Sequence, residues 1–498
     1  MNITHSYTRC RFGVATRDVT PPVGIYARTW GAATHEAAEG VHRPFAATAA
    51  VFAPITDDGP TLALVAVDIG WFQYGPDERR LRSLVMRRTG LDESELLISM
   101  SHTHAGPNVN SQLRDKPGVE LIQPYLDQLT DQIGAAIVEA RAGLAPAWVS
   151  YGYGRCAMAA NRDLWDARAE RFACGYNPDE PADDTLLVAR VTDDAGDPRA
   201  MLFNYACHPT TLAWQNRLLS PDYIGAAREV LERAYGVPAL FLQGASGDLG
   251  PRDDYVGDTS VADRNGRQLG HAAAAAIESL APPATRFVYT GIVASGANLG
   301  TWEYQPCDTD QLRSSGQLKA RMTHVELRRK DAPAVVDSLS SATPDAVQEQ
   351  EKALRRRFLE LTLGDLPVHE MPIWLWRLGD ALLVALPNEA YSVFQVELRR
   401  PGLFGVPGRA AATLRRDAAV GAEHDQRDTG LPAAQGDIRQ RALSGATVSV
   451  CARLPGADDR GCGGRARLAA PELSQRLDVR DLRATGIRAS GFRSCASQ

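Results

Sequence analysis

The chain has 498 residues, of which 44% are hydrophobic and 23% are charged, so it can bury a large core. Its net charge of −6 gives no electrostatic reason to expect nucleic acid or an anionic membrane as a partner. The N-terminal residues lack the basic start and apolar core of a signal peptide, and no apolar run is long enough to span a bilayer. We therefore expect a cytoplasmic protein whose eight cysteines, none in CxxC spacing, are reduced.

Residues 1–400 alternate short apolar runs with helix signals. In chain order, the pattern predicts strands over 61–68, 96–100, 200–206, 239–243 and 381–386. It predicts helices over 76–89, 125–142, 224–235, 267–280 and 390–399, with glycines as stop signals at 90, 143 and 236. Continuous apolar strands between helices indicate an α/β domain over 1–400, with mixed, largely parallel sheet layers covered by helices.

Polar side chains stand where these apolar runs end. His102 and His104 follow the run at 96–100, and His208 follows the run at 200–206. Asp248 follows the run at 239–243, and Glu389 follows the run at 381–386. Ligands of α/β sheets bind beyond the carboxyl ends of strands, so we expect a metal site at these strand C-terminal ends.

The His102-Thr103-His104 segment is the strongest local signal. Residues two apart in a strand face the same side, so this spacing predicts that both rings project together from the tip of a buried strand. A catalytic zinc takes three protein ligands, and two His with one Glu is an attested set. His102, His208 and Glu389 could form it, which leaves His104 as a general acid or base or as a substrate-binding group.

Each of these residues also has a structural interpretation. A histidine at a strand end is commonly structural, and Cys207-His208 could be buried packing. Glu389 could sit in the first turn of its helix, where the helix dipole favours it. Asp248 could be a turn residue after Gly247. The segment Gly-Ala-Ser-Gly-Asp at 244–248 is not GxSxG, which disfavours the nucleophile elbow of a serine hydrolase.

Several segments together resemble the N-terminal catalytic domain of the neutral/alkaline non-lysosomal ceramidase family. They are SHTHAGP at 101–107, NYACHPT at 204–210, GDLGPR at 247–252, LPNE at 386–389, VATRDVTPP at 14–22 and ANR at 160–162. Each motif alone is modest, but their order and spacing agree over residues 11 to about 400.

The resemblance implies hydrolysis of an N-acyl amide, from a ceramide-like lipid or a related small molecule, by metal-activated water. It implies Zn²⁺ held by His102, His208 and Glu389, with His104 near the scissile amide. Arg162 would lie close by and stabilise the oxyanion or anchor a polar head group. Asp248 is carried over as a third catalytic candidate with His104 and Arg162.

The sequence departs from the family pattern at two positions. The family carries a catalytic Ser where this chain has Gly250. The family also has a Tyr ligand downstream of its Glu, whereas the last Tyr here is Tyr391, two residues after Glu389 and too close to take that role. The alternatives are an inactive or ligand-binding member of the family, or a metal-dependent hydrolase of small polar amides or esters.

The composition changes after about residue 400. Residues 401–498 contain fifteen Arg but no Lys, Asn, Met, Trp or Tyr, which indicates an aberrant, poorly ordered tail rich in Arg, Ala and Gly. In a shifted frame, the codons from 426 permit N-G-T-L-G-Y-L-P and those from 451 permit A-P-G-C-L-E-R, both resembling the family. We infer a frameshift between about 400 and 425. An interaction role for the tail is disfavoured because it lacks interleaved aromatic residues.

Overall fold

The computed structural model describes residues 1–56, 58–328, 367–400 and 447–452, with scattered positions between 353 and 362. Of the predicted tail, only the backbone of β21 (Thr447–Ala452) falls within this part of the chain. The tail predicted over 401–498 otherwise lies outside the described residues. Among the helices described, none is long and apolar enough to cross a membrane.

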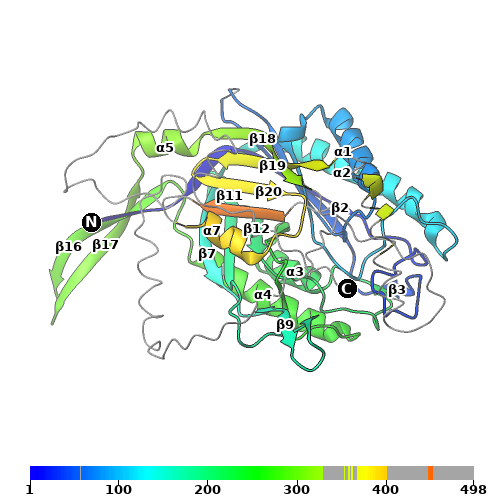
Figure 1. The fold of residues 1–498 in the computed structure, drawn as a ribbon. Coiled ribbons are helices and arrows are strands. Elements are labelled where there is room, and N and C mark those ends of the chain that lie inside the picture. Colours follow the sequence, from blue (N-terminus) through cyan, green and yellow to red (C-terminus); the bar gives the residue numbers. More distant parts are fainter. Residues whose placement is uncertain are drawn as a thin grey trace.

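The largest element is an eight-stranded sheet with the order β14-β12-β11-β7-β2-β4-β5-β6 (Figure 1). Its strands are β2 (Tyr7–Asp18), β4 (Ala46–Ala53), β5 (Leu62–Val67), β6 (Leu96–Met100), β7 (Ala145–Arg155), β11 (Thr185–Thr192), β12 (Pro198–Tyr205) and β14 (Ala239–Gln243). The edge strand β14 packs against β5 and β6 at the opposite edge, so the sheet curves until its two edges meet.

The mixed α/β class predicted from the sequence is confirmed, but the large sheet is mainly antiparallel rather than largely parallel. Only the outer pairs β5–β6 and β12–β14 are parallel. Both are strand–helix–strand units, joined by α1 (Gly75–Thr89) and by α3 (Tyr223–Tyr235). The central strands β2, β4, β7 and β11, which were not predicted, pair in antiparallel fashion.

One face of this sheet is covered by helices. α1 and α2 (Ile122–Ala142) bury the half formed by β2, β4, β5 and β6. α3 and α4 (Thr259–Glu278) bury the half formed by β11, β12 and β14. The predicted helices therefore exist, although α4 begins eight residues before its predicted start, at Thr259, where Asp258 caps it.

The other face is covered by a second sheet and not by helices, which corrects the prediction. This sheet has the order β18-β19-β20-β21 and comprises β18 (Leu318–Arg328), β19 (Val368–Leu378), β20 (Ala381–Leu386) and β21. Trp374 and Trp376 of β19 pack into the core between the sheets, and their indole N–H groups donate to the carbonyls of Glu93 and Ser94. The alternating apolar residues of β19 explain this cover, because one face of the strand is buried.

Smaller elements surround these layers. An arm is formed by β1 (Asn2–Thr4), β16 (Thr285–Ala294) and β17 (Asn298–Pro306). Three short strand pairs are β3 (Gly40–Val41) with β13 (Leu218–Leu219), β8 (Ala159–Asn161) with β15 (Leu249–Pro251), and β9 (Asp163–Asp166) with β10 (Arg171–Cys174). Two short helices are α5 (Thr309–Ser315) and α7 (Ser392–Leu398). The last of these begins two residues after its predicted start.

Candidate metal centre

The two histidines of the opening motif lie in a turn rather than in a strand. β6 ends at Met100, and His102 has φ 65°, in the left-handed region that few non-glycine residues adopt. The backbone N–H of His102 donates to the carbonyl of Ile69 at 3.0 Å. The imidazole centroids of His102 and His104 are 5.3 Å apart. The prediction that both rings come together is therefore right, but the turn produces it and strand alternation does not.

Backbone contacts with Ser220 hold this turn in place. The hydroxyl of Thr103 donates to the carbonyl of Ser220 at 2.7 Å, and the N–H of Ser220 donates to the carbonyl of Ala105 at 2.9 Å. Ser220 and Thr103 are fully buried. The turn is thus fixed to the chain that follows β13, and its conformation depends on that neighbouring segment.

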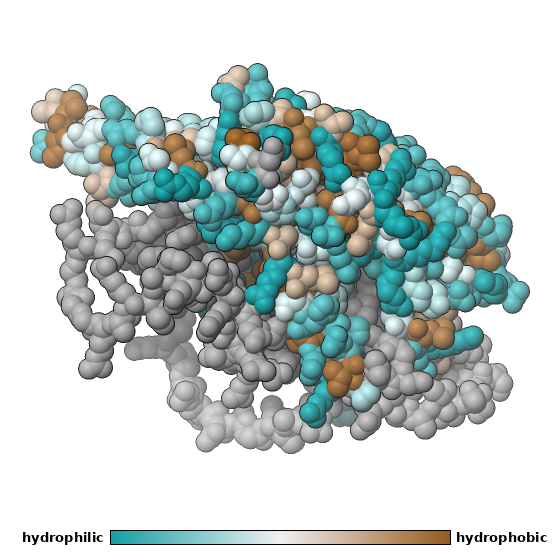
Figure 2. Space-filling view, turned by 90° about the horizontal axis from the view of Figure 1, so that it is seen from above, coloured by the Kyte–Doolittle hydropathy of each residue, from teal (hydrophilic) through white to brown (hydrophobic). Residues whose placement is uncertain are grey.

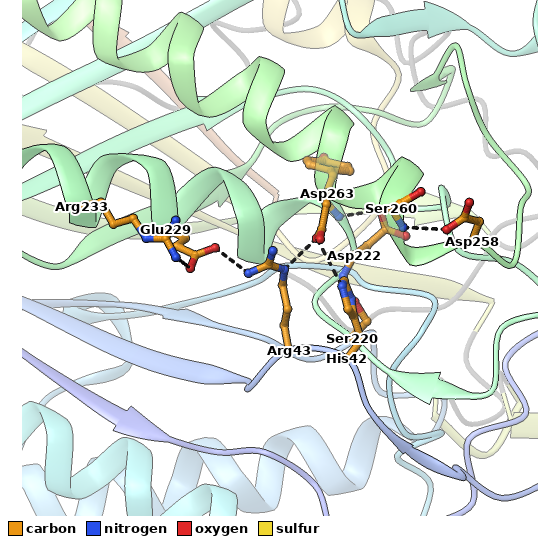
Figure 3. Close-up of polar contacts among 10 residues, drawn as sticks. His42, Arg43, Ser220, Asp222, Glu229, Arg233, Asp258, Ser260 and Asp263 are labelled. Atoms are coloured by element: carbon orange, nitrogen blue, oxygen red, sulfur yellow. Dashed lines mark hydrogen bonds and ion pairs between the residues drawn. The ribbon is translucent and has the colours of Figure 1, made fainter.

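A polar network connects Ser220 to α3 and α4 (Figure 3). The hydroxyl of Ser220 lies 2.9 Å from His42 Nδ1, and His42 Nε2 lies 3.3 Å from a carboxylate oxygen of Asp263 on α4. Arg43 binds Asp263 at 2.8 Å and Glu229 of α3 at 2.6 Å. Burial raises the pKa of Asp263, but its bonds with Arg43 outweigh burial and hold the pKa below its usual value. The ionised Asp263 therefore ties the turn to both helices.

His208 reaches the same place from the end of β12. Its backbone N–H donates to the carbonyl of Leu249, and its Nδ1 lies 2.8 Å from the carbonyl oxygen of Ser246. A carbonyl only accepts, so Nδ1 carries the proton and Nε2 keeps its lone pair. Burial, with the charge of Arg162, lowers the pKa of His208 to about 3, so the ring is neutral near pH 7. Neutral imidazole is the form that binds metals.

Glu389 approaches the histidines from the second sheet, where it follows β20. Its Oε1 lies 3.1 Å from His102 Nε2, and its Oε2 lies 3.5 Å from His208 Nε2. Burial raises the pKa of Glu389, but the facing His102 outweighs burial and holds the pKa well below its usual value. The side chain is therefore a carboxylate that points between two imidazoles.

These side chains together fit a metal ion. His102, His104 and His208 are buried, and each offers a ring nitrogen within 4.8 Å of the others'. Glu389 adds an anionic oxygen beside two of these rings. Imidazole nitrogens and one carboxylate are the ligands of catalytic zinc sites, and the carbonyl of Ser246 supplies the outer hydrogen bond that metal-binding histidines commonly make.

Arg162 lies beside this cluster, as expected. It is buried, and its guanidinium donates to the carbonyl of Gly247 at 3.0 Å. The same nitrogen lies 3.4 Å from His208 Nε2. Arg162 follows β8, whose pairing with β15 brings it to this position. A fixed positive charge next to the imidazoles suits the binding of an oxygen that becomes negative during reaction.

Asp248 is near the cluster but is engaged elsewhere. Its two carboxylate oxygens accept hydrogen bonds from the N–H and the hydroxyl of Ser392, at the start of α7. Its backbone carbonyl accepts from the N–H of Arg162 at 2.9 Å. Burial raises the pKa of Asp248. In this structure the side chain of Asp248 therefore positions the segment that carries Glu389.

Two tryptophans that sequence reasoning missed enclose the His pair. The ring centroid of Trp71 lies 5.4 Å from that of His102 and 4.7 Å from that of His104. Trp30 lies 5.1 Å from His104 on another side. Trp71 comes three residues after Asp68, at the end of the run predicted over 61–68, so the strand-end rule could have found it. Trp30 lies in a long loop and gave no comparable signal.

The two departures from the family pattern lie at the edge of this cluster. A Cβ at Gly250 would lie 3.0 Å from a carboxylate oxygen of Asp254 and 3.6 Å from Cδ of Arg162. A side chain at this position would therefore touch Arg162. Tyr391 directs its hydroxyl to the carboxylate of Asp163 at 2.9 Å.

Comparisons with known proteins agree with the motifs. Residues 10–261, half of the chain, match the family described as neutral/alkaline non-lysosomal ceramidase, N-terminal. The neutral ceramidase of Pseudomonas aeruginosa is 25% identical over 249 residues, which cover 48% of this chain and 37% of that protein. Neutral ceramidase B of Dictyostelium discoideum is 29% identical over 202 residues, which cover 35% of this chain and 27% of that protein. The chain thus matches well under half the length of either relative.

The fold is also similar to a solved structure. The crystal structure of neutral ceramidase from Pseudomonas aeruginosa superposes with a TM-score of 0.50 and 20% sequence identity. The match covers 76% of this chain and 61% of that one. At this identity the likeness concerns the fold, and it extends beyond the 252 residues matched by sequence. The resemblance inferred from the six motifs is confirmed.

Proposed function

Because the chain belongs to the neutral/alkaline non-lysosomal ceramidase family, we propose that it is a zinc-dependent hydrolase of N-acyl amides. The proposed zinc ligands are His102, His208 and Glu389. The observation that carries the proposal is their convergence from two sheets, with Glu389 placed between two imidazoles. The curated relatives are named neutral ceramidases, which supports an N-acyl lipid such as a ceramide as the substrate.

The residues divide the chemistry between them. When bound, zinc would polarise the amide carbonyl and activate water for attack. His104 lies against this position and would accept a proton from the attacking water and deliver it to the leaving amine. Arg162 would stabilise the negative charge on the carbonyl oxygen. Asp248 would hold the Glu389 segment through Ser392.

The position of Gly250 bears on the substrate. The hydroxyl that the family's Ser supplies is missing there, so no step in this proposal uses a serine. The metal ligands, His104 and Arg162 do not depend on it. A panel of N-acyl substrates, from ceramides to short polar amides and esters, defines the range. Activity confined to short polar amides would remove the lipid assignment.

Metal analysis of the purified chain tests the proposal. We expect about one zinc per chain after reconstitution, and loss of both zinc and amide hydrolysis in His102→Asn. Asparagine is a suitable replacement because it tolerates the left-handed conformation of His102. His271→Gln, which changes an exposed histidine on α4, is the matched control and should keep both properties. A wild-type chain that takes up no zinc would leave the proposal without its basis.

A further inference from the structure

A β-sheet arm projects from the body of the protein, beside the N-terminus (Figure 1). β16 and β17 form an antiparallel hairpin, and β1 pairs with β16 on the side nearer the body. The hairpin turns at Ser295, whose N–H donates to the carbonyl of Ala297. A Cβ added at Gly291 or Gly296 would meet no atom within 4 Å, so the outer part of the arm stands clear of the described residues.

The outer part of the arm carries no charge. Residues 287–302 are sixteen consecutive residues without Asp, Glu, Lys or Arg, in a chain that is 23% charged. The nearest charged residues are Arg286 and Glu303, which flank the stretch at its base. Exposed hairpins usually carry charged residues that prevent unwanted association. An exposed hairpin without charged residues is therefore expected to contact an apolar partner.

The apolar side chains on the arm differ between its tip and its base. Near the tip, Ile292, Val293 and Leu299 are 65%, 52% and 49% exposed. Towards the base, Trp302 stacks on Phe287 with an interplanar angle of 19°, and tyrosines flank them. Figure 2 shows hydrophobic side chains, in brown, gathered at the left end of the molecule, where the arm lies. Aliphatic residues beyond a belt of Trp and Tyr are typical of segments that enter a membrane interface.

The aliphatic side chains project from both faces of the hairpin. Ile292 pairs with Gly300, and Val293 pairs with Leu299. Neighbouring positions of a strand point to opposite faces, so Ile292 lies on one face and the Val293–Leu299 pair on the other. A flat protein surface would cover one face of the arm. A fluid apolar medium surrounds both faces, which is what this distribution matches.

We propose that the tip of this arm inserts into the interfacial zone of a phospholipid bilayer. The insertion is shallow, because β17 is an edge strand among the described residues, and the backbone groups of such an edge cannot enter the hydrocarbon core unpaired. From the turn to Ile292 the hairpin spans about 13 Å along its strands, so a tilted arm places its tip within the roughly 5–10 Å at which interfacial segments lie. The partner is a neutral, phosphatidylcholine-type surface, since the net charge of −6 and the uncharged tip give no attraction to anionic head groups. This inference does not depend on the proposed hydrolysis.

Sedimentation of the full chain with phosphatidylcholine vesicles tests the proposal. We expect the wild-type chain to bind, with an affinity that changes less than twofold between low and high salt. The double variant Val293→Asp with Leu299→Asp should bind at least tenfold more weakly. Val138→Asp changes a valine of α2 that is 45% exposed, and this control should bind as the wild type does. All three side chains are exposed, and matching circular dichroism spectra would show that each variant folds.

The same samples distinguish the alternatives. A wild-type chain that does not sediment with the vesicles overturns the proposal. So does equal binding by the wild type and the double variant. Sedimentation velocity without lipid tests whether a second copy of the chain binds to the arm. Self-association that the double variant abolishes, without vesicle binding, would assign the arm to a protein interface and overturn the lipid assignment.

Discussion

The carboxylate of Asp248 accepts two hydrogen bonds from Ser392, one from its backbone N–H at 2.6 Å and one from its hydroxyl at 2.7 Å. Ser392 opens α7 three residues after Glu389. The N–H of Gly247 also donates to the carbonyl of Ala390 at 2.8 Å. The segment that carries the only proposed carboxylate ligand is therefore held by the residues that follow β14.

This arrangement predicts that Ser392→Ala weakens metal binding although Ser392 touches no metal ligand side chain. The variant keeps the backbone bond to Asp248 but leaves one carboxylate oxygen without its hydroxyl donor, which costs about 1–3 kcal/mol of stability. Partners that hydrogen-bond a metal ligand directly contribute about tenfold or more to metal affinity, so we expect a loss of up to about tenfold from this more remote contact. Zinc competition with a chromogenic chelator measures it. Ser83→Ala, which removes an exposed hydroxyl on α1, is the control, and equal zinc affinity in both variants would contradict the prediction.

Arg162→Lys should lower kcat more than it changes KM. A lysine keeps the positive charge, but it lacks the planar pair of N–H groups with which Arg162 donates to the carbonyl of Gly247 beside His208. Removal of one donor to a developing oxyanion costs roughly 100-fold in kcat. Steady-state kinetics on an N-acyl amide separate the two constants. Arg252→Lys, at an exposed arginine directly after β15, is the matched control, and a change confined to KM would assign Arg162 to ground-state binding instead.

The buried carboxyl group of Asp222 should make the free energy of unfolding fall as the pH rises from about 4 to 6. Burial raises the pKa of Asp222 to about 6, against the hydrogen bonds from Leu212, Tyr223 and Thr211 that lower it. Between about pH 4 and 6 the folded chain keeps a proton that the unfolded chain has released, so this group lowers the free energy of unfolding as pH increases. Asp222→Asn removes that dependence. The variant should gain about 3 kcal/mol relative to wild type between pH 3.5 and 6.5, at 1.36 kcal/mol per pKa unit.

Urea unfolding of the metal-free protein across this pH range measures the effect, and a chelator keeps zinc release out of the result. A constant difference between Asp222→Asn and wild type at every pH would show that the pKa of Asp222 is not raised in the folded state. A difference that shrinks as the pH rises would have the opposite sign to the prediction.

The frameshift proposed for residues 401–498 is decided by the gene. We expect its sequence around codons 395–430 to contain an inserted or deleted base between about 400 and 425. The alternative frame should then continue open and encode the N-G-T-L-G-Y segment. An alternative frame interrupted by stop codons, with regular codon usage in the frame that encodes this chain, would reject the shift.

The strand–helix–strand units were predictable because their signals are local. β5, α1 and β6 combine a continuous apolar run, a proline at the start of the helix and Gly90 in the left-handed conformation at its end. β4 was missed because its sequence, AATAAVFA, is rich in alanine and has little strand propensity. β2 pairs with β4 and with the distant β7, and such long-range antiparallel pairing leaves no local pattern.

The cluster of histidines was predicted for a reason that is only partly right. The rule that the carboxyl ends of strands meet holds for parallel sheets. In this sheet, the successive pairings make β6 and β12 run in opposite directions. His102 and His208 meet because the sheet curves and its edges approach. Glu389 follows a strand of the other sheet, so the strand-end rule selected this residue without giving a reason for it to lie beside His102 and His208. Trp30 lies in a loop whose path depends on tertiary packing.

The donors of the candidate metal centre belong to separate layers, since the histidines follow strands of the large sheet and Glu389 follows a strand of the second. An ion bound by them would cross-link the two sheets without any covalent bond. Zinc release would then do more than stop chemistry: it would remove a tie between layers and leave a buried carboxylate facing two imidazoles. We expect the layers to unfold as one cooperative unit with zinc, and the second sheet to exchange its amide hydrogens sooner without it.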